Sequence, residues 1–329
     1  MNWTLPALIF AFTALASFAG VRVLIGVLKR RAVLDHPNAR SSHDIPTPKG
    51  GGIAIIAILL LAWLFINLIQ APLSDPLVVI PACAFVLAVI SWADDLNGLS
   101  PLTRLAAQTA AVTAALVFGP EQSPLFQGLL PMPVDTFVAG LLWVWFINLF
   151  NFMDGIDGIT GIEAASIGIG IVLISGEVPG LYAIAIVGVT VGFLKWNWHP
   201  AKVFMGDVGS VPLGFLLGWL LLGMAADGYW VAALILPAYY LMDATTTLVR
   251  RALAGEKVWQ AHREHFYQKA VQRGLSHATV SRAVLSLNSV LVVAAIMSTK
   301  GWAGPALILT VVLVALFLRW LAGSQGTRP

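Results

Sequence analysis

Apolar runs of about 20 residues recur along nearly the whole of this 329-residue chain. A helix of that length can cross the hydrocarbon core of a bilayer, which is roughly 30 Å thick. Charged residues make up 11% of the chain, against about 25% in soluble domains, and the mean hydropathy is +0.85. A soluble core would not contain so many helices that are apolar all round. We therefore predict an all-α polytopic integral membrane protein.

Eleven of these runs are candidate transmembrane helices. They lie at about residues 3–28, 51–70, 77–92, 102–119, 135–152, 159–175, 180–196, 210–226, 229–250, 279–298 and 303–321. We expect the first run to be retained rather than cleaved as a signal peptide. It is long, and the basic cluster of Lys29, Arg30 and Arg31 follows it instead of preceding it.

The basic residues predict how these helices are oriented. If the N-terminus is outside, every one of the 19 Lys and Arg residues except Lys300 falls in a cytoplasmic segment or at a cytoplasmic helix end. Basic residues concentrate on the cytoplasmic side, so we predict a periplasmic N-terminus and a cytoplasmic C-terminus. A basic face suits anionic lipids and substrates, and it gives no argument for nucleic acid. The one cysteine, Cys83, excludes a disulfide within the chain.

Acidic, amide and imidazole side chains cluster in four segments. These are SWADDLNGLSP at 91–101, NFMDGIDGITG at 151–161, KWNWHPAKVFMGDVGS at 195–210 and AHREHFYQKA at 261–270. Each segment joins an odd-numbered predicted helix to the next even-numbered one, so all four open on the cytoplasmic side. The coincidence predicts one shared polar site on that face.

The neighbouring acids Asp94 and Asp95 are the first candidates for chemistry. Adjacent acids in a loop are usually solvated, but this loop is short and carries no Lys or Arg before Arg104. Two carboxylates held side by side repel each other, so they need a cation or a proton. Both outcomes suit catalysis, either as a ligand for Mg²⁺ or as a base with a raised pKa.

Three more aspartates precede apolar helices. Asp154 and Asp157 are three residues apart and would share a helix face, where Gly155 and Gly158 leave room for a phosphate. The alternative is that one of the two caps the following helix. Asp207, between glycines in VFMGDVGS, is either a helix N-cap or a ligand of Mg²⁺, which prefers carboxylate oxygens.

The segment AHREHFYQ is either a solvated basic loop or an anion-binding one. His262, Arg263 and His265 lie within four residues and suit binding of a pyrophosphate. Zinc is less favoured than Mg²⁺, because the histidines are spaced i,i+3 without a cysteine partner. We expect the loop to lie outside the bilayer, so that loss of either histidine side chain leaves no large cavity.

A secondary transporter that uses aspartates as ion ligands is the alternative from a different class. Transporters place coupling carboxylates near the bilayer midplane. Here Asp243 lies within a predicted helix, about two turns from Arg250, and it is a functional candidate unless it pairs with an arginine. The concentration of acids at one end of the helices favours an enzyme.

These four segments, together with PTPKGGG at 46–52, resemble the polyprenyl-phosphate N-acetylhexosamine-1-phosphate transferases over about residues 35–270. The resemblance implies one transmembrane catalytic domain, residues 1–329, in the bacterial inner membrane. Its active-site loops would be 29–50, 93–101, 151–160, 197–209 and 251–278, on the cytoplasmic face. The family further implies Mg²⁺, with Mn²⁺ as an alternative, a UDP-N-acetylhexosamine donor and undecaprenyl phosphate as acceptor.

The family motifs also imply roles for individual residues. The catalytic residues would be Asp94, Asp95, Asp154, Asp157, His262 and His265, with Asp207 and Asp94 as metal ligands. The substrate-binding residues would be Lys49, Asn151, Asn197, Lys202 and Arg263. Either Asp94 or Asp95 could be the base that takes a proton from the lipid phosphate.

One departure bears on which branch of the family the chain resembles. The peptidoglycan enzyme, which transfers phospho-MurNAc-pentapeptide, has three consecutive histidines where this chain reads His-Arg-Glu-His. The difference favours the branch that begins O-antigen synthesis and keeps the peptidoglycan reaction as the alternative. The sequence leaves open whether the sugar is GlcNAc, QuiNAc or FucNAc, and whether the chain forms a homodimer.

Overall fold

The computed structural model describes residues 3–37, 42, 45–70, 76–120, 123–258, 260 and 262–323. Arg40 and Arg328, two of the basic residues assigned to the cytoplasmic side, lie outside the described residues. The elements are α1 (Thr4–Arg30), β1 (Leu34–Asp35), β2 (Thr47–Pro48), α2 (Gly52–Gln70), η1 (Pro76–Val78), α3 (Val79–Asn97), α4 (Pro101–Phe118), α5 (Met132–Phe152), α6 (Ile159–Ile174), α7 (Glu177–Asn197), α8 (Asp207–Met224), η2 (Ala225–Tyr229), α9 (Trp230–Ile235), α10 (Ala238–Leu253), α11 (Phe266–Gln272), α12 (His277–Met297), η3 (Ser298–Trp302) and α13 (Ala303–Ala322).

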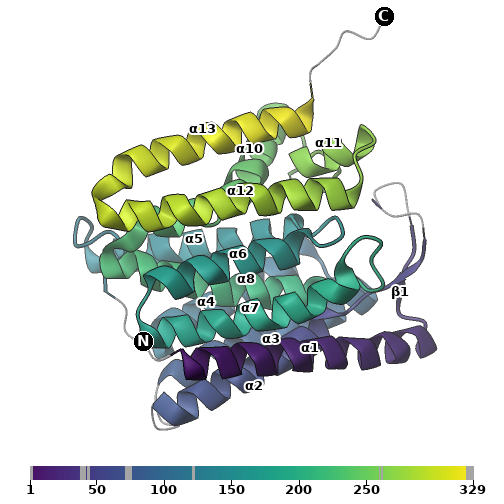
Figure 1. Ribbon diagram of the computed structural model, residues 1–329. Coiled ribbons are helices and arrows are strands. Elements are labelled where there is room, and N and C mark those ends of the chain that lie inside the picture. Colours follow the sequence, from purple (N-terminus) through teal and green to yellow (C-terminus); the bar gives the residue numbers. More distant parts are fainter. Residues whose placement is uncertain are drawn as a thin grey trace, which may run out of the picture.

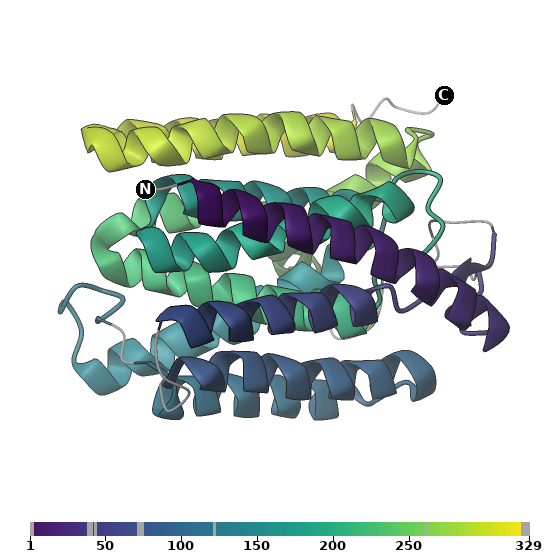
Figure 2. The ribbon, with the colours of Figure 1, turned by 60° about the horizontal axis from the view of Figure 1, so that its bottom comes forward.

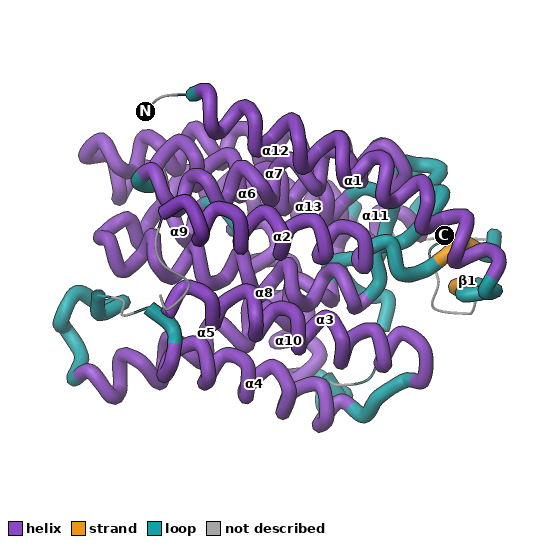
Figure 3. The backbone as a smooth tube through the Cα atoms, turned by 90° about the horizontal axis from the view of Figure 1, so that it is seen from below, coloured by secondary structure: helices purple, strands orange, loops and turns teal. Residues whose placement is uncertain are grey.

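The long helices lie side by side, and the connecting segments collect at the two ends of the bundle (Figure 1). Helices α12 and α13 cover one side, α2 to α4 lie on the other, and α6 to α8 lie between them (Figure 2). Strand β1 and helix α11 mark one end of the bundle (Figure 3). The start of α1 and the end of α13 lie at opposite ends of the bundle.

Burial separates the inner helices from the outer ones. Side chains of α6, α7 and α8 are buried along most of their length. The outer helices instead expose large apolar side chains, such as Phe12 on α1, Val117 on α4 and Leu316 on α13. Lipid tails are as apolar as these side chains, so such a surface is stable in a bilayer and would aggregate in water.

The structure supports the all-α membrane architecture. Among the described residues, eight helical stretches are long and apolar enough to cross a membrane, and α6 is a shorter apolar helix. One of these stretches includes α12, η3 and α13, although α12 and α13 are two helices that lie antiparallel, side by side (Figure 1). Helices therefore occupy the eleven predicted ranges, whereas the number of true crossings and the orientation stay predictions.

Two expectations about helix boundaries were wrong. The run at 229–250 is not one helix, because α9 ends at Ile235 and α10 begins at Ala238. Pro237 lies at this break, where a proline removes a backbone donor and crowds the preceding turn. In addition, α3 continues to Asn97, so Asp94 and Asp95 lie in its last turns and not in a loop.

Candidate active site

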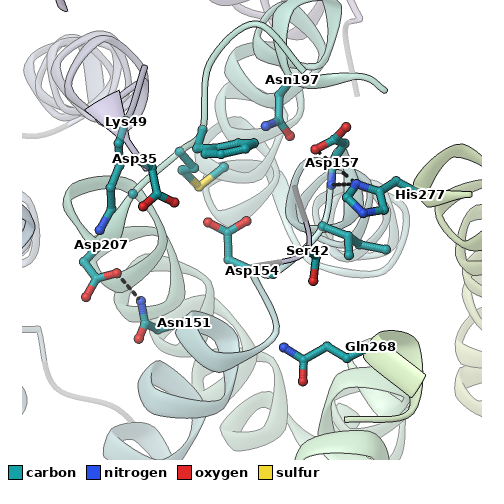
Figure 4. A pocket seen from close by; sticks show the side chains of 15 residues that line it. Asp35, Ser42, Lys49, Asn151, Asp154, Asp157, Asn197, Asp207, Gln268 and His277 are labelled. Atoms are coloured by element: carbon teal, nitrogen blue, oxygen red, sulfur yellow. Dashed lines mark hydrogen bonds and ion pairs between the residues drawn. The ribbon is translucent and has the colours of Figure 1, made fainter. Parts of the chain in front are cut away.

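A polar cavity opens at the end of the bundle that carries the predicted cytoplasmic segments. Its volume is ≈ 250 Å³. Six of the predicted site residues line it, namely Lys49, Asn151, Asp154, Asp157, Asn197 and Asp207. Asp154 lies in the middle, with Asp207 and Asn151 to one side and Asp157 and His277 to the other (Figure 4). The structure therefore brings residues from distant segments into one site, as the sequence predicted.

Lys49 reaches the cavity because two glycine-rich segments pack backbone against backbone. Gly51 N donates to the carbonyl of Phe204 at 2.8 Å, and Gly52 N donates to that of Met205 at 2.9 Å. A Cβ on Gly52 would lie 2.3 Å from the Cα of Gly209, so only glycine permits this approach. The segment PTPKGGG is thereby held beside MGDVGS.

Asp95 holds the start of α8 and does not line the cavity. Its Oδ1 accepts from the backbone N of Asp207 at 3.1 Å, and its Oδ2 accepts from that of Val208 at 2.9 Å. Lys49 Nζ lies 2.7 Å from the same carboxylate, whose side chain is 1% exposed. An acid at a helix N-terminus satisfies free N–H groups and opposes the helix dipole. The alternative that Asp207 is the N-cap was thus wrong, since Asp95 supplies the cap from another helix.

Asp207 is the carboxylate that faces two hollows. Asn151 Nδ2 donates to its Oδ1 at 3.1 Å, and Arg104 Nη1 lies 3.8 Å from its Oδ2. Its side chain keeps 25% exposure, so the oxygens remain accessible. Besides the polar cavity, Asp207 lines a second hollow of ≈ 170 Å³ between α3, α4, α5 and α8.

The second hollow is largely apolar, with polar groups near Asp207. Arg104 Nη1 lies 3.4 Å from Asp94 Oδ2, and Asp94 Oδ1 accepts from the backbone N of Leu99. The remaining lining includes Leu87, Ile90 and Val211. Asp94 therefore contributes to this hollow, and Asp94 and Asp95 face different partners although they are neighbours in sequence.

Asp154 is the carboxylate at the centre of the polar cavity. It lies in the loop between α5 and α6 and is half-buried. Burial raises its pKa to about 7; a hydrogen bond with Thr160 opposes the shift and the charge of Asp207 adds to it. Burial alone would lower the pKa of Lys49, but Asp95 and Asp207 outweigh burial and raise it. The cavity thus holds a charged lysine and a carboxyl that titrates near neutral pH.

Asp157 faces away from Asp154, towards two histidines. His199 Nδ1 lies 2.7 Å from Asp157 Oδ2, and His277 Nδ1 lies 3.3 Å from Oδ1. Burial alone would raise the pKa of Asp157, but hydrogen bonds from His277 and His199 outweigh it and lower the pKa. The expected shared helix face was wrong, because both aspartates precede α6 in a loop.

The start of α6 is held by an amide and not by an aspartate. Its N-cap is Gly158, which has a φ of 81° and no side chain to cap the helix. Asn197 Oδ1 accepts from the backbone N of Gly158 at 2.9 Å, and Asn197 Nδ2 donates to the carbonyl of Val203 at 2.9 Å. The alternative that Asp154 or Asp157 caps α6 was therefore wrong. Asn197 both lines the cavity and ties α7 to the loop before α6.

The two histidines of the segment at 261–270 do not line the polar cavity, although Gln268 of the same segment does. His265 is 2% exposed and is the N-cap of α11, where its Nδ1 lies 3.2 Å from Asp243 Oδ1. Asp243 also accepts from the backbone N of Phe266 at 3.0 Å and of Tyr267 at 3.3 Å. The expectation that neither histidine fills buried space was wrong for His265. Asp243 pairs with this segment rather than with Arg250.

His262, Arg263 and Lys202 are also absent from the cavity lining. Burial, His265 and Arg251 lower the pKa of His262 to about 4, so its ring carries no charge at pH 7. Lys202 lies in a separate hollow and stands over the Trp196 ring at 5.4 Å. The phosphate-binding roles of His262, Arg263, His265 and Lys202 stay predictions.

The structure adds residues that sequence reasoning did not single out. Asp35, Ser42, Phe204, Gln268 and His277 line the polar cavity. Arg104, noted only as the next basic residue after the acids, joins Asp94 to Asp207. A single histidine at a helix start, or a lone arginine in an apolar helix, belongs to no periodic pattern that would single it out. Arg104 had one other signal in the sequence, its position close to the acids Asp94 and Asp95.

The side chains around Asp207 fit a hard divalent cation. Mg²⁺ prefers carboxylate and amide oxygens and leaves positions for substrate phosphates. The described lining of the polar cavity supplies four aspartates against one lysine, which leaves an excess of negative charge to be neutralised. Asp207 would hold the ion, and Asp94 or Asp154 is placed to assist it from the two hollows.

Comparison with known proteins identifies the family of this chain. The model of the family described as glycosyl transferase family 4 matches residues 77–225, which run from η1 into η2 and include Asp94, Asp154 and Asp207. The undecaprenyl-phosphate alpha-N-acetylglucosaminyl 1-phosphate transferase of Escherichia coli (strain K12) is 30% identical over 287 residues, covering 82% of this chain and 76% of that protein.

Two further relatives carry similar names. The "Probable undecaprenyl-phosphate N-acetylglucosaminyl 1-phosphate transferase" of Bacillus subtilis (strain 168) is 25% identical and covers 95% of this chain and 91% of that protein. The decaprenyl-phosphate N-acetylglucosaminephosphotransferase of Mycobacterium leprae (strain TN) is 28% identical and covers 78% and 75%. All three names describe transferases, which favours the enzyme over the transporter. This chain belongs to glycosyl transferase family 4, among the polyprenyl-phosphate N-acetylhexosamine-1-phosphate transferases.

Proposed function

We propose that this protein transfers N-acetylglucosamine-1-phosphate from UDP-GlcNAc to undecaprenyl phosphate, with Mg²⁺, and releases UMP. The observation that carries the proposal is the position of Asp207, which lines both a polar cavity and a largely apolar hollow. A reaction between a water-soluble nucleotide and a membrane lipid needs such a meeting point. The relatives' names support a polyprenyl phosphate acceptor and GlcNAc as the sugar.

The polar cavity is the proposed donor site. Lys49 provides a permanent positive charge there, and Asn151 Nδ2 is a donor beside Asp207. These groups suit the pyrophosphate of a UDP-sugar, since charge-assisted hydrogen bonds to phosphate are the stronger kind. Bound Mg²⁺ would neutralise the pyrophosphate and stabilise the departing UMP. Asp207 would hold the ion, and Mn²⁺ is the expected substitute.

The apolar hollow is the proposed acceptor site. Its walls come from α3, α4, α5 and α8, so a prenyl chain lying there would stay in contact with the lipid region. Arg104, with 38% of its side chain exposed, stands beside Asp94 and Asp207 and suits the lipid phosphate. This arrangement would bring the acceptor phosphate to the same aspartate as the donor.

The proposed reaction exchanges one phosphorus–oxygen bond for another. An oxygen of the lipid phosphate attacks the β-phosphorus, a bond forms, and the bond from that phosphorus to the bridging oxygen of UMP breaks. Positioning and charge neutralisation can supply most of the acceleration in phosphoryl transfer. A general base needs to remove a proton from only a minor fraction of the lipid phosphate at neutral pH, because the second pKa of a phosphate monoester is near 6. Asp154 suits that task better than Asp95, whose two oxygens are occupied by Lys49 and the start of α8.

We place the reaction on the cytoplasmic face of the bacterial inner membrane, as the first membrane step of O-antigen or other surface-polysaccharide synthesis. The basic residues support that side, since the cavity lies at the bundle end that carries Lys29 and Arg30 at the end of α1. The His-Arg-Glu-His segment supports this branch over the peptidoglycan reaction.

The test is UMP release by the purified protein with undecaprenyl phosphate and Mg²⁺. The donors are UDP-GlcNAc, UDP-QuiNAc, UDP-FucNAc and UDP-MurNAc-pentapeptide, each with wild type and with Asp207→Asn. We expect UDP-GlcNAc to be turned over fastest and the variant to lose nearly all activity. Faster turnover of UDP-MurNAc-pentapeptide would replace the proposal with the peptidoglycan reaction, and equal rates for both proteins would remove Asp207 from the site.

A further inference from the structure

A second cluster of metal-ligating groups lies at the edge of the polar cavity, away from Asp207. It consists of Asp157, His199 and His277, and one ligand atom from each lies within 4.8 Å of the others. Among the described residues, this is the one group of three His, Cys, Asp or Glu side chains arranged in this way. The three side chains come from the α5–α6 loop, the α7–α8 loop and the first residue of α12.

We propose that Asp157, His199 and His277 form a binding site for a zinc-type transition-metal ion, separate from the Mg²⁺ site at Asp207. Two imidazole nitrogens and one carboxylate oxygen are a common ligand set for Zn²⁺ and a poor one for Mg²⁺. The inference does not rest on the proposed sugar-phosphate transfer, because it follows from these three side chains alone.

Each imidazole nitrogen approaches an oxygen of the Asp157 carboxylate at about the separation that a tetrahedral ion requires. Ligands at about 2.0–2.1 Å from zinc lie roughly 3.3 Å from one another. His277 Nδ1 is 3.3 Å from Asp157 Oδ1, and His199 Nδ1 is 2.7 Å from Oδ2. The His199 ring would have to move outward by a few tenths of an ångström or more. It can do so because its side chain is 38% exposed.

The carboxylate is held in place by contacts that an ion would not disturb. The backbone N of Ala201 donates to Asp157 Oδ2 at 3.1 Å, and Ser281 Oγ donates to the Asp157 carbonyl at 2.7 Å. Outer contacts of this kind orient metal ligands and raise affinity.

An ion at this site would also affect the cavity. Asp157 and His277 line it, and the three ligands tie together two loops and α12. A bound transition metal should therefore stabilise this end of the bundle and slow turnover at a saturating Mg²⁺ concentration. The ion would hold Asp157 and His277, two residues that line the cavity, in fixed positions beside the proposed donor site.

The test is Zn²⁺ binding to the intact purified protein in detergent, measured by calorimetry with Mg²⁺ in excess. We expect one Zn²⁺ per chain, and a weakening of about 100-fold or more in His199→Asn and His277→Asn. Loss of outer contacts alone already costs metal sites about 10–100-fold. Asparagine can place an amide nitrogen near the Nδ1 position, so Asp157 keeps a hydrogen-bond donor and the variants should still fold.

The matched control is His262→Ala. His262 belongs to the other histidine pair, whose rings lie 4.8 Å apart, and this variant should bind Zn²⁺ as wild type does. Co²⁺ should give the intense visible absorption of a four-coordinate ion in wild type, and lose it in both asparagine variants. No binding to wild type, binding unchanged in both asparagine variants, or loss in His262→Ala would each overturn the proposal. None of these readouts depends on transferase activity.

Discussion

Asp95 near the end of α3 caps the helix that begins at Asp207, 112 positions later in the chain. Its two carboxylate oxygens accept from the backbone N–H groups of Asp207 and Val208, at 3.1 and 2.9 Å. Lys49 pairs with the same carboxylate at 2.7 Å. One acid therefore fixes where Asp207 stands and where the cavity lysine points, although it does not itself line the cavity.

We predict that Asp95→Asn lowers stability and activity together. An asparagine can accept only one of the two backbone hydrogen bonds, and it loses the ion pair with Lys49. Loss of a helix cap costs about 0.5–2 kcal/mol, and the variant should melt at a lower temperature. Asp227→Asn, at an exposed position of η2 at the far end of α8, is the matched control. An Asp95→Asn protein that melts like wild type but is inactive would instead point to a chemical role for Asp95.

The raised pKa of Asp154 predicts how stability depends on pH. The folded protein holds this proton up to pH about 7, whereas the unfolded chain releases it near 3.8. The native state binds more protons between these values, so this group reduces stability as the pH rises from about 4 to 7. Asp154→Asn cannot titrate. In the absence of Mg²⁺ its melting temperature should match wild type near pH 4 and exceed it at pH 8. A constant difference across that range would contradict the raised pKa.

The same group predicts the pH dependence of the reaction. If Asp154 acts as a base it must be ionised, so kcat should fall as the pH drops below about 7. The lipid phosphate titrates near pH 6, so its contribution must be separated. Asp154→Asn should lose most of the rate. The pH profile of its residual activity should lack the titration step near pH 7 and keep the step near pH 6. Wild-type rates in that variant would exclude Asp154 as the base.

The two histidines of AHREHFYQ should respond differently to truncation. His265 is buried, caps α11 and pairs with Asp243, whereas His262 is half-buried. His265→Ala should lose about 1–3 kcal/mol, the range for a buried hydrogen-bonding group left without its partner. His262→Ala should change stability much less. Thermal melting of both variants in the same detergent decides the matter, and equal melting would contradict the buried arrangement.

We predict that cysteines introduced at the two ends of the bundle differ in their reaction with an impermeant thiol reagent. Gln272 at the end of α11 and Lys300 in η3 are both exposed, and they lie at opposite ends of α12. In a Cys83→Ala background, Lys300→Cys should react with an impermeant thiol reagent in intact cells, and Gln272→Cys should react only after lysis. The reverse pattern would invert the orientation and place the cavity outside.

Local patterns predicted much of this structure. Apolar length located the helices, and the rule that alternate loops share a side predicted that Asn151, Asp157 and Asp207 would meet. The break before α10 also had a signal in Pro237, because a proline inside a helical pattern usually ends or kinks the helix. The prediction of one helix at 229–250 rested on the length of the apolar run alone.

The contacts between distant segments could not be predicted from the sequence. Asp94 and Asp95 look alike in the sequence, and only the rotation of α3 relative to α8 sends one to Arg104 and the other to the start of α8. His265 caps a helix although histidine is not among the usual cap residues. His277 joins Asp157 because α12 starts beside the α5–α6 loop, a packing relationship that no motif records.

The most direct test of the proposed reaction follows the β-phosphate of the donor. UDP-GlcNAc labelled at that phosphorus is incubated with undecaprenyl phosphate, Mg²⁺ and purified protein, and the lipid and aqueous fractions are separated. Transfer of the sugar with its phosphate predicts that the label enters the lipid fraction while unlabelled UMP appears in equal amount, and that Asp207→Asn abolishes both. Label that stays in the aqueous fraction as UDP while sugar enters the lipid would show transfer of the sugar alone and would contradict the account.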